Sequence, residues 1–99
     1  MQKTLQELLE RNRQAMFRIA RANRAESLAL FGSYARGTET PTSDIDLLVT
    51  FSPKATLFDH ARLEAELSEL LGVSVDVVSA AVLKDDAFGR HVRQEAIAL

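Results

Sequence analysis

The stretch "LALFGSYARGTETPTSDIDLLVTF", residues 28–51, joins two apolar segments through a polar one and decides how this chain folds. The first apolar segment, residues 27–31, predicts a short buried strand that stops at Gly32. Residues 44–51 predict a second strand, which is preceded by the turn-forming "TPTS". The polar segment between the two strands has room for one short helix, so it is either an ordinary connection or a site that holds a phosphate and a metal.

Helices are predicted on both sides of this stretch. Apolar residues recur at helical spacing over residues 4–23 and again over residues 58–71, where Gly72 supplies a C-terminal stop. A third strand is predicted over residues 73–79, and a last helix begins near Lys84 or Asp85. This last helix is expected to reach the C-terminus, because four apolar residues lie one turn apart along it: Phe88, Val92, Ala96 and Leu99.

Together these elements predict an α/β (α+β) fold in which a small mixed β-sheet carries flanking helices. The order is helix, strand, short helix, strand, helix, strand, helix. The link between the second and third strands contains a full helix, which is long enough for a right-handed parallel crossover. Ser33 follows the end of the first strand and Asp44 opens the second, so the two residues can share a site only if these strands pair antiparallel.

Length and composition set the class of protein. With 99 residues, 46% of them hydrophobic, the chain fits one domain, residues 1–99, with a modest core. The net charge of -2 argues against a general affinity for nucleic acid. The chain has no cysteine and no apolar run that approaches about 18 residues, so we expect a soluble protein of the cytoplasm.

The dipeptide Gly32-Ser33 lies where a strand gives way to a helix. Backbone N–H groups lack partners at such a point and the helix dipole is positive, so an anion fits there. Glycine would let a phosphate approach the backbone, and the hydroxyl of Ser33 could donate one further hydrogen bond. The alternative is that Ser33 is an ordinary N-cap and Gly32 a turn residue, and the dipeptide alone favours this alternative.

Asp44 and Asp46 are two apart on the predicted second strand, so both carboxylates are expected on one face. Mg²⁺ prefers oxygen ligands and keeps waters and substrate phosphates in the rest of its shell, so the pair could hold such an ion. The alternative is a turn residue followed by a solvated one. That alternative has a difficulty, because strands disfavour aspartate and neighbouring carboxylates repel each other.

Asp76 lies inside the apolar segment "VSVDVVS", residues 73–79. A buried lone carboxylate there would need a partner or a shifted pKa, whereas on an edge strand the side chain could simply face outward. Taken with Asp44 and Asp46, however, it completes a set of three carboxylates on adjacent strands. Such a set suits two-metal phosphoryl transfer, with Asp76 holding the ion that activates the attacking hydroxyl or accepting the proton of that hydroxyl.

The two motifs together carry a resemblance to a known family. "GSYARG" followed by "SDIDLLV", with ten residues between Ser33 and Asp44, resembles the signature of the DNA polymerase β-like nucleotidyltransferase superfamily. Over nearly its whole length, the chain is similar to the minimal nucleotidyltransferases, which are commonly paired with a HEPN-domain toxin. The resemblance implies that Gly32 and Ser33 bind the triphosphate, with Arg36 supporting the phosphate loop. It also implies that Asp44, Asp46 and Asp76 form the catalytic, metal-binding set, with two Mg²⁺ ions.

The resemblance further implies a reaction, which is transfer of AMP from ATP to a hydroxyl with release of pyrophosphate. In members that act as antitoxins, the acceptor is a tyrosine of the HEPN toxin, so a hetero-oligomer is expected, with neither a membrane nor nucleic acid as direct partner. A second hypothesis is a catalytically silent antitoxin that neutralises its partner by complex formation alone. A third, modification of an aminoglycoside, is disfavoured because such relatives carry an extra domain for the drug.

Overall fold

The computed structural model describes residues 5–40 and 42–99. Thr4 of the predicted first helix and Pro41 of the predicted turn lie outside the described residues. Within these ranges, none of the helices is both long and apolar enough to span a membrane. In chain order the elements are α1 (Leu5–Ala22), β1 (Ala25–Phe31), α2 (Ser33–Arg36), β2 (Ile45–Phe51), α3 (Leu57–Leu71), β3 (Val75–Ser79), the 3₁₀ turn η1 (Ala80–Val82), α4 (Ala87–Glu95) and β4 (Ile97–Ala98).

The strands form one mixed sheet in the order β3-β2-β1-β4. β1 and β2 pair antiparallel, and β2 and β3 pair parallel, which confirms both predicted pairings. The antiparallel pair is possible because only the four-residue helix α2 and a turn separate the two strands, whereas the parallel pair is joined through α3. The α/β fold with a small mixed sheet and flanking helices is therefore confirmed.

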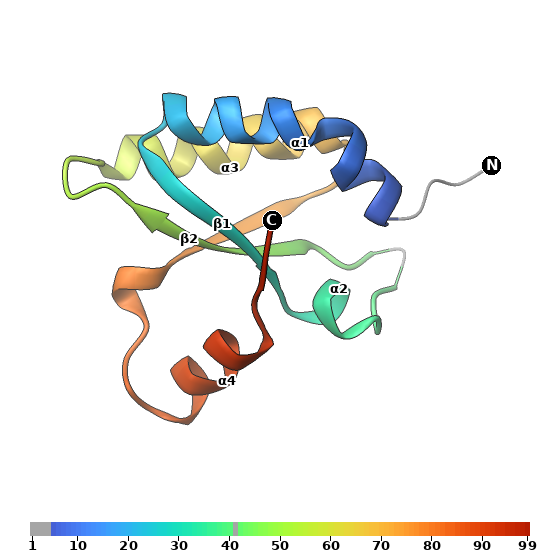
Figure 1. Ribbon diagram of the computed structural model, residues 1–99, viewed down its shortest axis with the longest axis vertical. Coiled ribbons are helices and arrows are strands. Elements are labelled where there is room, and N and C mark those ends of the chain that lie inside the picture. Colours follow the sequence, from blue (N-terminus) through green and yellow to red (C-terminus); the bar gives the residue numbers. More distant parts are fainter. Residues whose placement is uncertain (1–4, 41) are drawn as a thin grey trace.

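Helices α1 and α3 lie side by side over one face of the sheet (Figure 1). The alternating residues Ile45, Leu47 and Val49 of the central strand β2 are completely buried. They point toward the two helices, and the apolar stripes of α1 and α3 contribute Met16, Ala20, Leu63, Leu67 and Leu71 to the same core. Because successive side chains in a strand alternate between the faces, Asp46 and Leu48 are left on the opposite face, toward α4.

The predicted C-terminal helix is wrong over its last residues. α4 ends at Glu95, because Ala96 takes an extended conformation, and β4 then pairs antiparallel with β1. Only part of the expected apolar stripe is buried, since Val92 is enclosed whereas Phe88 is 63% exposed. The outer edge of β1 offers unpaired backbone groups, and the β-branched Ile97 suits a strand, so pairing with this edge displaces the last helical turn.

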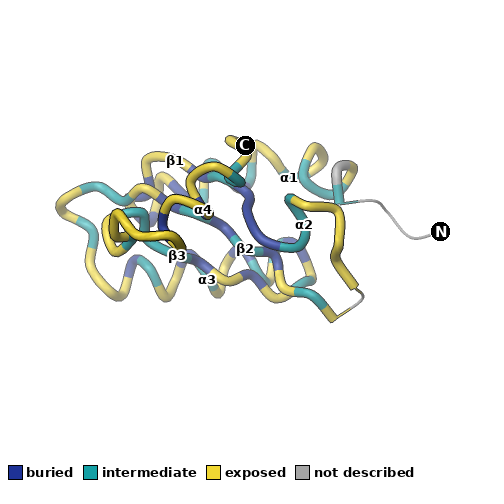
Figure 2. The backbone as a smooth tube through the Cα atoms, turned by 90° about the horizontal axis from the view of Figure 1, so that it is seen from below, coloured by how far each residue is buried: buried dark blue, intermediate teal, exposed yellow. Residues whose placement is uncertain are grey.

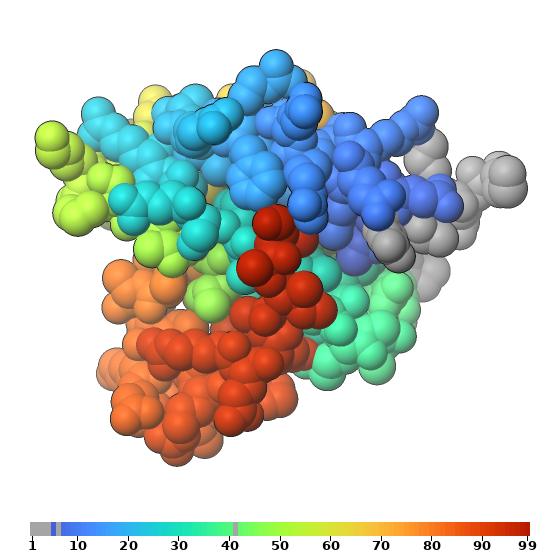
Figure 3. Space-filling model, in the orientation of Figure 1, coloured from blue at the N-terminus to red at the C-terminus, as the bar shows by residue number. Residues whose placement is uncertain are grey.

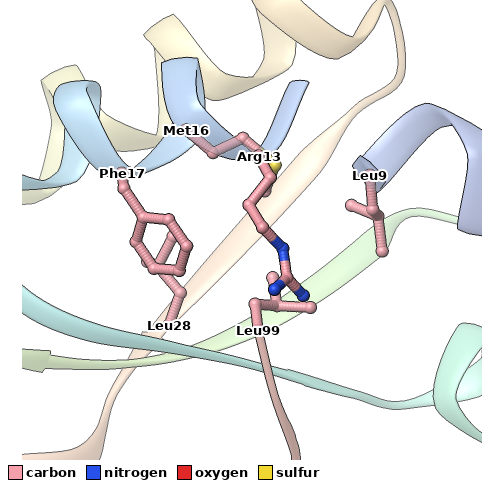
Figure 4. Close-up of a pocket in the computed structure, with 6 residues that line it drawn as sticks. All are labelled: Leu9, Arg13, Met16, Phe17, Leu28 and Leu99. Atoms are coloured by element: carbon pink, nitrogen blue, oxygen red, sulfur yellow. The ribbon is translucent and has the colours of Figure 1, made fainter. Parts of the chain in front are cut away.

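The C-terminal Leu99 closes the core beneath α1. Its backbone N–H donates to the carbonyl of Leu28 at 3.1 Å. Figure 4 shows its side chain below the guanidinium of Arg13, at a cavity of about 10 Å³ between α1 and β1. In the space-filling view the red C-terminal residues rest against the blue residues of α1 (Figure 3). The last strand is thus part of the body of the molecule, and it flanks β1 just before the Gly-Ser turn.

Candidate active site

The predicted site residues lie where β1 ends and where β2 and β3 begin. In the register of the sheet, Phe31 is opposite Asp46, and Asp46 is opposite Asp76. Gly32 and the first residue of α2, Ser33, follow directly after Phe31. Figure 2 shows this end of β1 as a buried segment that leads into α2. Antiparallel pairing on one side of β2 and parallel pairing on the other therefore bring together residues that are more than forty positions apart.

Gly32 brings the backbone against the carboxylate of Asp46. It is buried, has φ 80°, and is itself the N-cap of α2, so the alternative in which Ser33 is the cap is wrong. A methyl group at position 32 would overlap Oδ2 of Asp46 and lie 3.0 Å from its Cγ. Among the described residues no side chain caps the first turn of α2. The first backbone N–H groups of α2 are thus left without a side-chain partner from the described residues, beside a carboxylate.

Asp44 and Asp46 differ in their surroundings. β2 begins at Ile45, so Asp44 lies just before the strand and is exposed, which corrects its predicted place within the strand. Asp46 is within the strand and half-buried. The backbone N–H of Ile45 donates to the carbonyl of Ser74 at 2.9 Å and so ties the start of β2 to the segment that leads into β3. Of the three carboxylates, that of Asp46 is therefore the one that the sheet holds most closely, because it alone is both within a strand and half-buried.

Asp76 lies on β3, which is an edge strand, and its side chain is exposed. Of the two alternatives for Asp76, the outward-facing side chain is therefore the correct one, and its carboxylate needs no buried partner. Its connection with the site comes from the parallel register, which places it directly beside Asp46. An exposed carboxylate at the sheet edge can be reached by a large acceptor such as another protein.

The charges of these residues act on one another. Burial raises the pKa of Asp46, and the carboxylates of Asp76 and Asp44 raise it further, whereas the guanidinium of Arg36 lowers it. A carboxylate beside like charges is destabilised in its ionised form, and a nearby cation relieves that repulsion. The arrangement is therefore strained by its own charge in the protein alone, and it favours a positively charged occupant.

The residues present fit a hard cation by their chemistry. Three carboxylates supply the oxygen ligands that Mg²⁺ prefers, and the backbone of Gly32 lies directly against one of them. In residues 5–40 and 42–99, no three His, Cys, Asp or Glu side chains are already gathered into a group that could hold a metal ion. The register of the sheet and the mutual repulsion thus define the candidate ligands Asp44, Asp46 and Asp76.

Glu95, at the end of α4, belongs to the same neighbourhood, and its place there was not predicted from the sequence. Its carboxylate forms an ion pair with Arg36 at 2.6 Å, and its charge also raises the pKa of Asp46. Glu95 is the last residue of α4 and was correctly predicted as helical, but its contact with α2 was not predicted. The motif residue Arg36 could have indicated such a contact, because an arginine beside the site is expected to pair with an acidic residue.

The raised pKa of Asp46 predicts a pH dependence for the metal-free protein. A raised pKa means that the folded state binds the proton more tightly than the unfolded state, so this residue lowers the free energy of unfolding as pH rises through its pKa. In EDTA, Asp46→Asn should therefore be more stable than the wild type at pH 7, and the difference should shrink as the pH falls through the raised pKa and vanish below about 4. Urea unfolding of both proteins from pH 3 to pH 8 measures this difference in the free energy of unfolding. A difference that grows on acidification would contradict the prediction.

Comparison with known proteins agrees with this geometry. The nucleotidyltransferase domain family matches residues 5–98 of the chain. A protein of Methanocaldococcus jannaschii, provisionally named a protein adenylyltransferase, is 33% identical over 95 residues, which span 96% of this chain and 97% of that protein. The similarity thus extends over both halves of the candidate site.

Solved structures share the fold. One that is provisionally named a minimal nucleotidyltransferase superposes with a TM-score of 0.82 at 43% identity, over 94% of each chain. Another, described as a toxin-antitoxin with AMP-PNP, matches with a TM-score of 0.61 at 28% identity, over 74% of this chain and 60% of that one. The chain therefore belongs to the nucleotidyltransferase domain family, among its minimal nucleotidyltransferases.

Proposed function

We propose that this protein transfers AMP from ATP to a hydroxyl group of a partner protein, with release of pyrophosphate and with Mg²⁺ as cofactor. The observation that carries the proposal is the contact between the bare backbone of Gly32 and the carboxylate of Asp46, which itself lies beside Asp76. A phosphate-binding turn and a set of carboxylates are useful together only where a phosphorus atom is attacked next to a cation.

In this proposal, Gly32 and Ser33 bind the triphosphate. The turn at Gly32 admits a phosphate because it has no side chain, and the start of α2 offers backbone N–H groups and the hydroxyl of Ser33. Arg36, whose side chain is half exposed, adds a positive charge at the other end of α2. These residues would orient the nucleotide so that the α-phosphorus faces the carboxylates.

Asp44, Asp46 and Asp76 would hold Mg²⁺. When bound, the cation would neutralise charge on the phosphate oxygens and lower the pKa of the attacking hydroxyl. The hydroxyl oxygen forms a bond to the α-phosphorus, the bond from that phosphorus to the bridging oxygen breaks, and pyrophosphate leaves. Asp76 is exposed at the edge of the sheet, so it is placed to take the proton of the incoming hydroxyl.

A protein is the acceptor that best fits the comparisons. Relatives that align along nearly the whole chain are named for protein adenylylation, and a similar structure is described as a toxin-antitoxin with AMP-PNP. We therefore propose a tyrosine of a HEPN-domain toxin as acceptor and a complex of the two proteins as the working form. The exposed position of Asp76 at the sheet edge supports an acceptor that is brought in by a partner.

Incubation with a candidate HEPN partner, ATP and Mg²⁺ tests this proposal. The partner should gain the mass of AMP on a tyrosine, as tandem mass spectrometry would show, and pyrophosphate should appear in equal amount. EDTA should reduce both signals to background, because three carboxylates and a triphosphate repel one another without a cation. Modification that persists in EDTA would contradict the role of Mg²⁺.

The same experiment separates this function from a silent antitoxin. If the Asp44→Asn, Asp46→Asn double variant still binds the toxin and neutralises it completely, complex formation alone is sufficient. If the double variant binds the toxin but leaves it active, neutralisation depends on transfer of AMP. Binding can be followed by size-exclusion chromatography, and toxin activity in the same samples.

A further inference from the structure

The ion pair between Arg36 and Glu95 links two segments that lie far apart in the sequence. Nη1 of Arg36, at the end of α2, donates to Oε1 of Glu95, at the end of α4. The other carboxylate oxygen of Glu95 lies 3.5 Å from Nε2 of His91, one turn earlier in α4. The hydrogen bond from Arg36, at 2.6 Å, is thus the close contact that orients this carboxylate.

The two partners differ in exposure. The side chain of Glu95 is only 10% exposed, whereas that of Arg36 is 49% exposed. An arginine has five N–H donors, and within the described part of the chain the guanidinium of Arg36 makes a single hydrogen bond, through Nη1. Glu95 therefore fixes one corner of the guanidinium and leaves the remaining donors on the open side.

Both charges lie near the candidate active site. After burial and the carboxylates of Asp76 and Asp44, which raise the pKa of Asp46, Arg36 lowers that pKa and Glu95 raises it. A fourth carboxylate in this neighbourhood would by itself weaken the binding of an anionic triphosphate. The ion pair with Arg36 offsets this effect, so the main interaction of Glu95 at this site is with the arginine.

The segment that follows Glu95 supports the same turn from the other side. Ile97 pairs with Leu30 and Ala98 with Ala29, two positions that come shortly before Gly32. The ends of α4 and β4 therefore enclose both sides of the Gly-Ser turn: Glu95 holds the helix after it, and β4 holds the strand before it. Rigid neighbours of this kind keep a binding group in its productive orientation.

We infer that Glu95 is a positioning residue, which holds the guanidinium of Arg36 so that its exposed donors face the triphosphate at the Gly32-Ser33 turn. Glu95 itself contacts neither the nucleotide nor the acceptor. This inference rests on the proposed function, because it assigns a second role within the same site. It goes beyond the motif, since residue 95 lies far outside both parts of it.

Nucleotide binding by four proteins tests the inference: the wild type, Glu95→Gln, Arg36→Ala and the double variant. The Kd for a non-hydrolysable ATP analogue with Mg²⁺ is measured by calorimetry, and KM and kcat are measured where turnover occurs. Glu95→Gln is expected to raise Kd and KM roughly tenfold and to leave kcat within about twofold, because the loss falls on a charge-assisted hydrogen bond to the nucleotide. The double variant should bind no more weakly than Arg36→Ala.

A matched control comes from the start of the same helix. Asp85 and Arg90 form an exposed ion pair at 3.1 Å that lies away from the Gly-Ser turn. Asp85→Asn removes the same kind of interaction and should leave Kd and KM unchanged. The exchanged pair, Arg36→Glu with Glu95→Arg, should be thermally more stable than either single variant, because the ion pair forms again. It should not recover nucleotide binding, because the guanidinium is then attached to α4 and no longer to α2.

Three results would overturn the inference: unchanged Kd in Glu95→Gln, an equal effect of Glu95→Gln with and without Arg36, or full binding in the exchanged pair. Failure of the proposed function looks different. In that case the wild type transfers no AMP to any partner, while the binding measurements still decide whether Glu95 acts through Arg36.

Discussion

Replacing Asp46 with asparagine is expected to lower kcat/KM for transfer of AMP by about a thousandfold, because it removes several kcal/mol of charge stabilisation from the transition state. Asp46 is the central member of the set, with Asp76 beside it in the register and the backbone of Gly32 in contact with its carboxylate. Asparagine has nearly the same shape, so the packing around the side chain should not change. Transfer is measured as pyrophosphate release with the partner present.

The stability of this variant should change in the opposite direction. In the metal-free protein, the charge of Asp46 is disfavoured by burial and by two neighbouring carboxylates, so asparagine removes a repulsion. A variant that is inactive and yet at least as stable as the wild type distinguishes loss of a functional group from loss of the fold. Glu69→Gln, at an exposed position of α3, is the matched control and should change neither property. Transfer at the wild-type rate by Asp46→Asn would disprove the assigned role.

The fold could be predicted from the sequence wherever a local pattern determines it. The alternation of Ile45, Leu47 and Val49 predicts the core face of β2, and the structure buries all three completely. Gly72 predicts the end of α3 and does end it, with φ 68°. The antiparallel pairing of β1 and β2 was predicted from the short link together with the condition that Ser33 and Asp44 share a site, and the structure confirms it. These features depend on residues that are close together in the chain.

Features that depend on distant segments were missed. β4 has two residues, and it is a strand only because β1 offers its outer edge. Glu95 lies 59 positions from Arg36, and no local pattern relates the two. The carboxylate set was predicted by spacing and resemblance, yet the position of Asp44 before the strand follows from where β2 begins, and the place of β3 at the sheet edge decides between the two alternatives for Asp76. Tertiary pairing therefore decides the details of the site.

Gly32→Ala should have the second large effect, with a loss of about a hundredfold in kcat/KM, because small displacements of reacting groups cost about that much. The new methyl group would overlap the carboxylate of Asp46, so either the carboxylate or the turn must move. Stability should also fall by about 2–5 kcal/mol, which combines the strain of alanine at positive φ with overpacking. Urea unfolding and pyrophosphate release measure the two effects.

Gly37→Ala is a control for positive φ without a steric contact. Gly37 has φ 73° and ψ 22°, in the left-handed helical region, whereas Gly32 has φ 80° and ψ -156°, a conformation that is essentially restricted to glycine, and a methyl group at Gly37 would meet nothing within 4 Å. It should therefore lose only about 1–2 kcal/mol of stability, the strain alone, and keep most of its activity. If the contact with Asp46 explains the difference, Gly32→Ala combined with Asp46→Gly should regain stability without regaining transfer. Equal effects of Gly32→Ala and Gly37→Ala would show instead that Gly32 is needed for its backbone conformation and not for its closeness to Asp46.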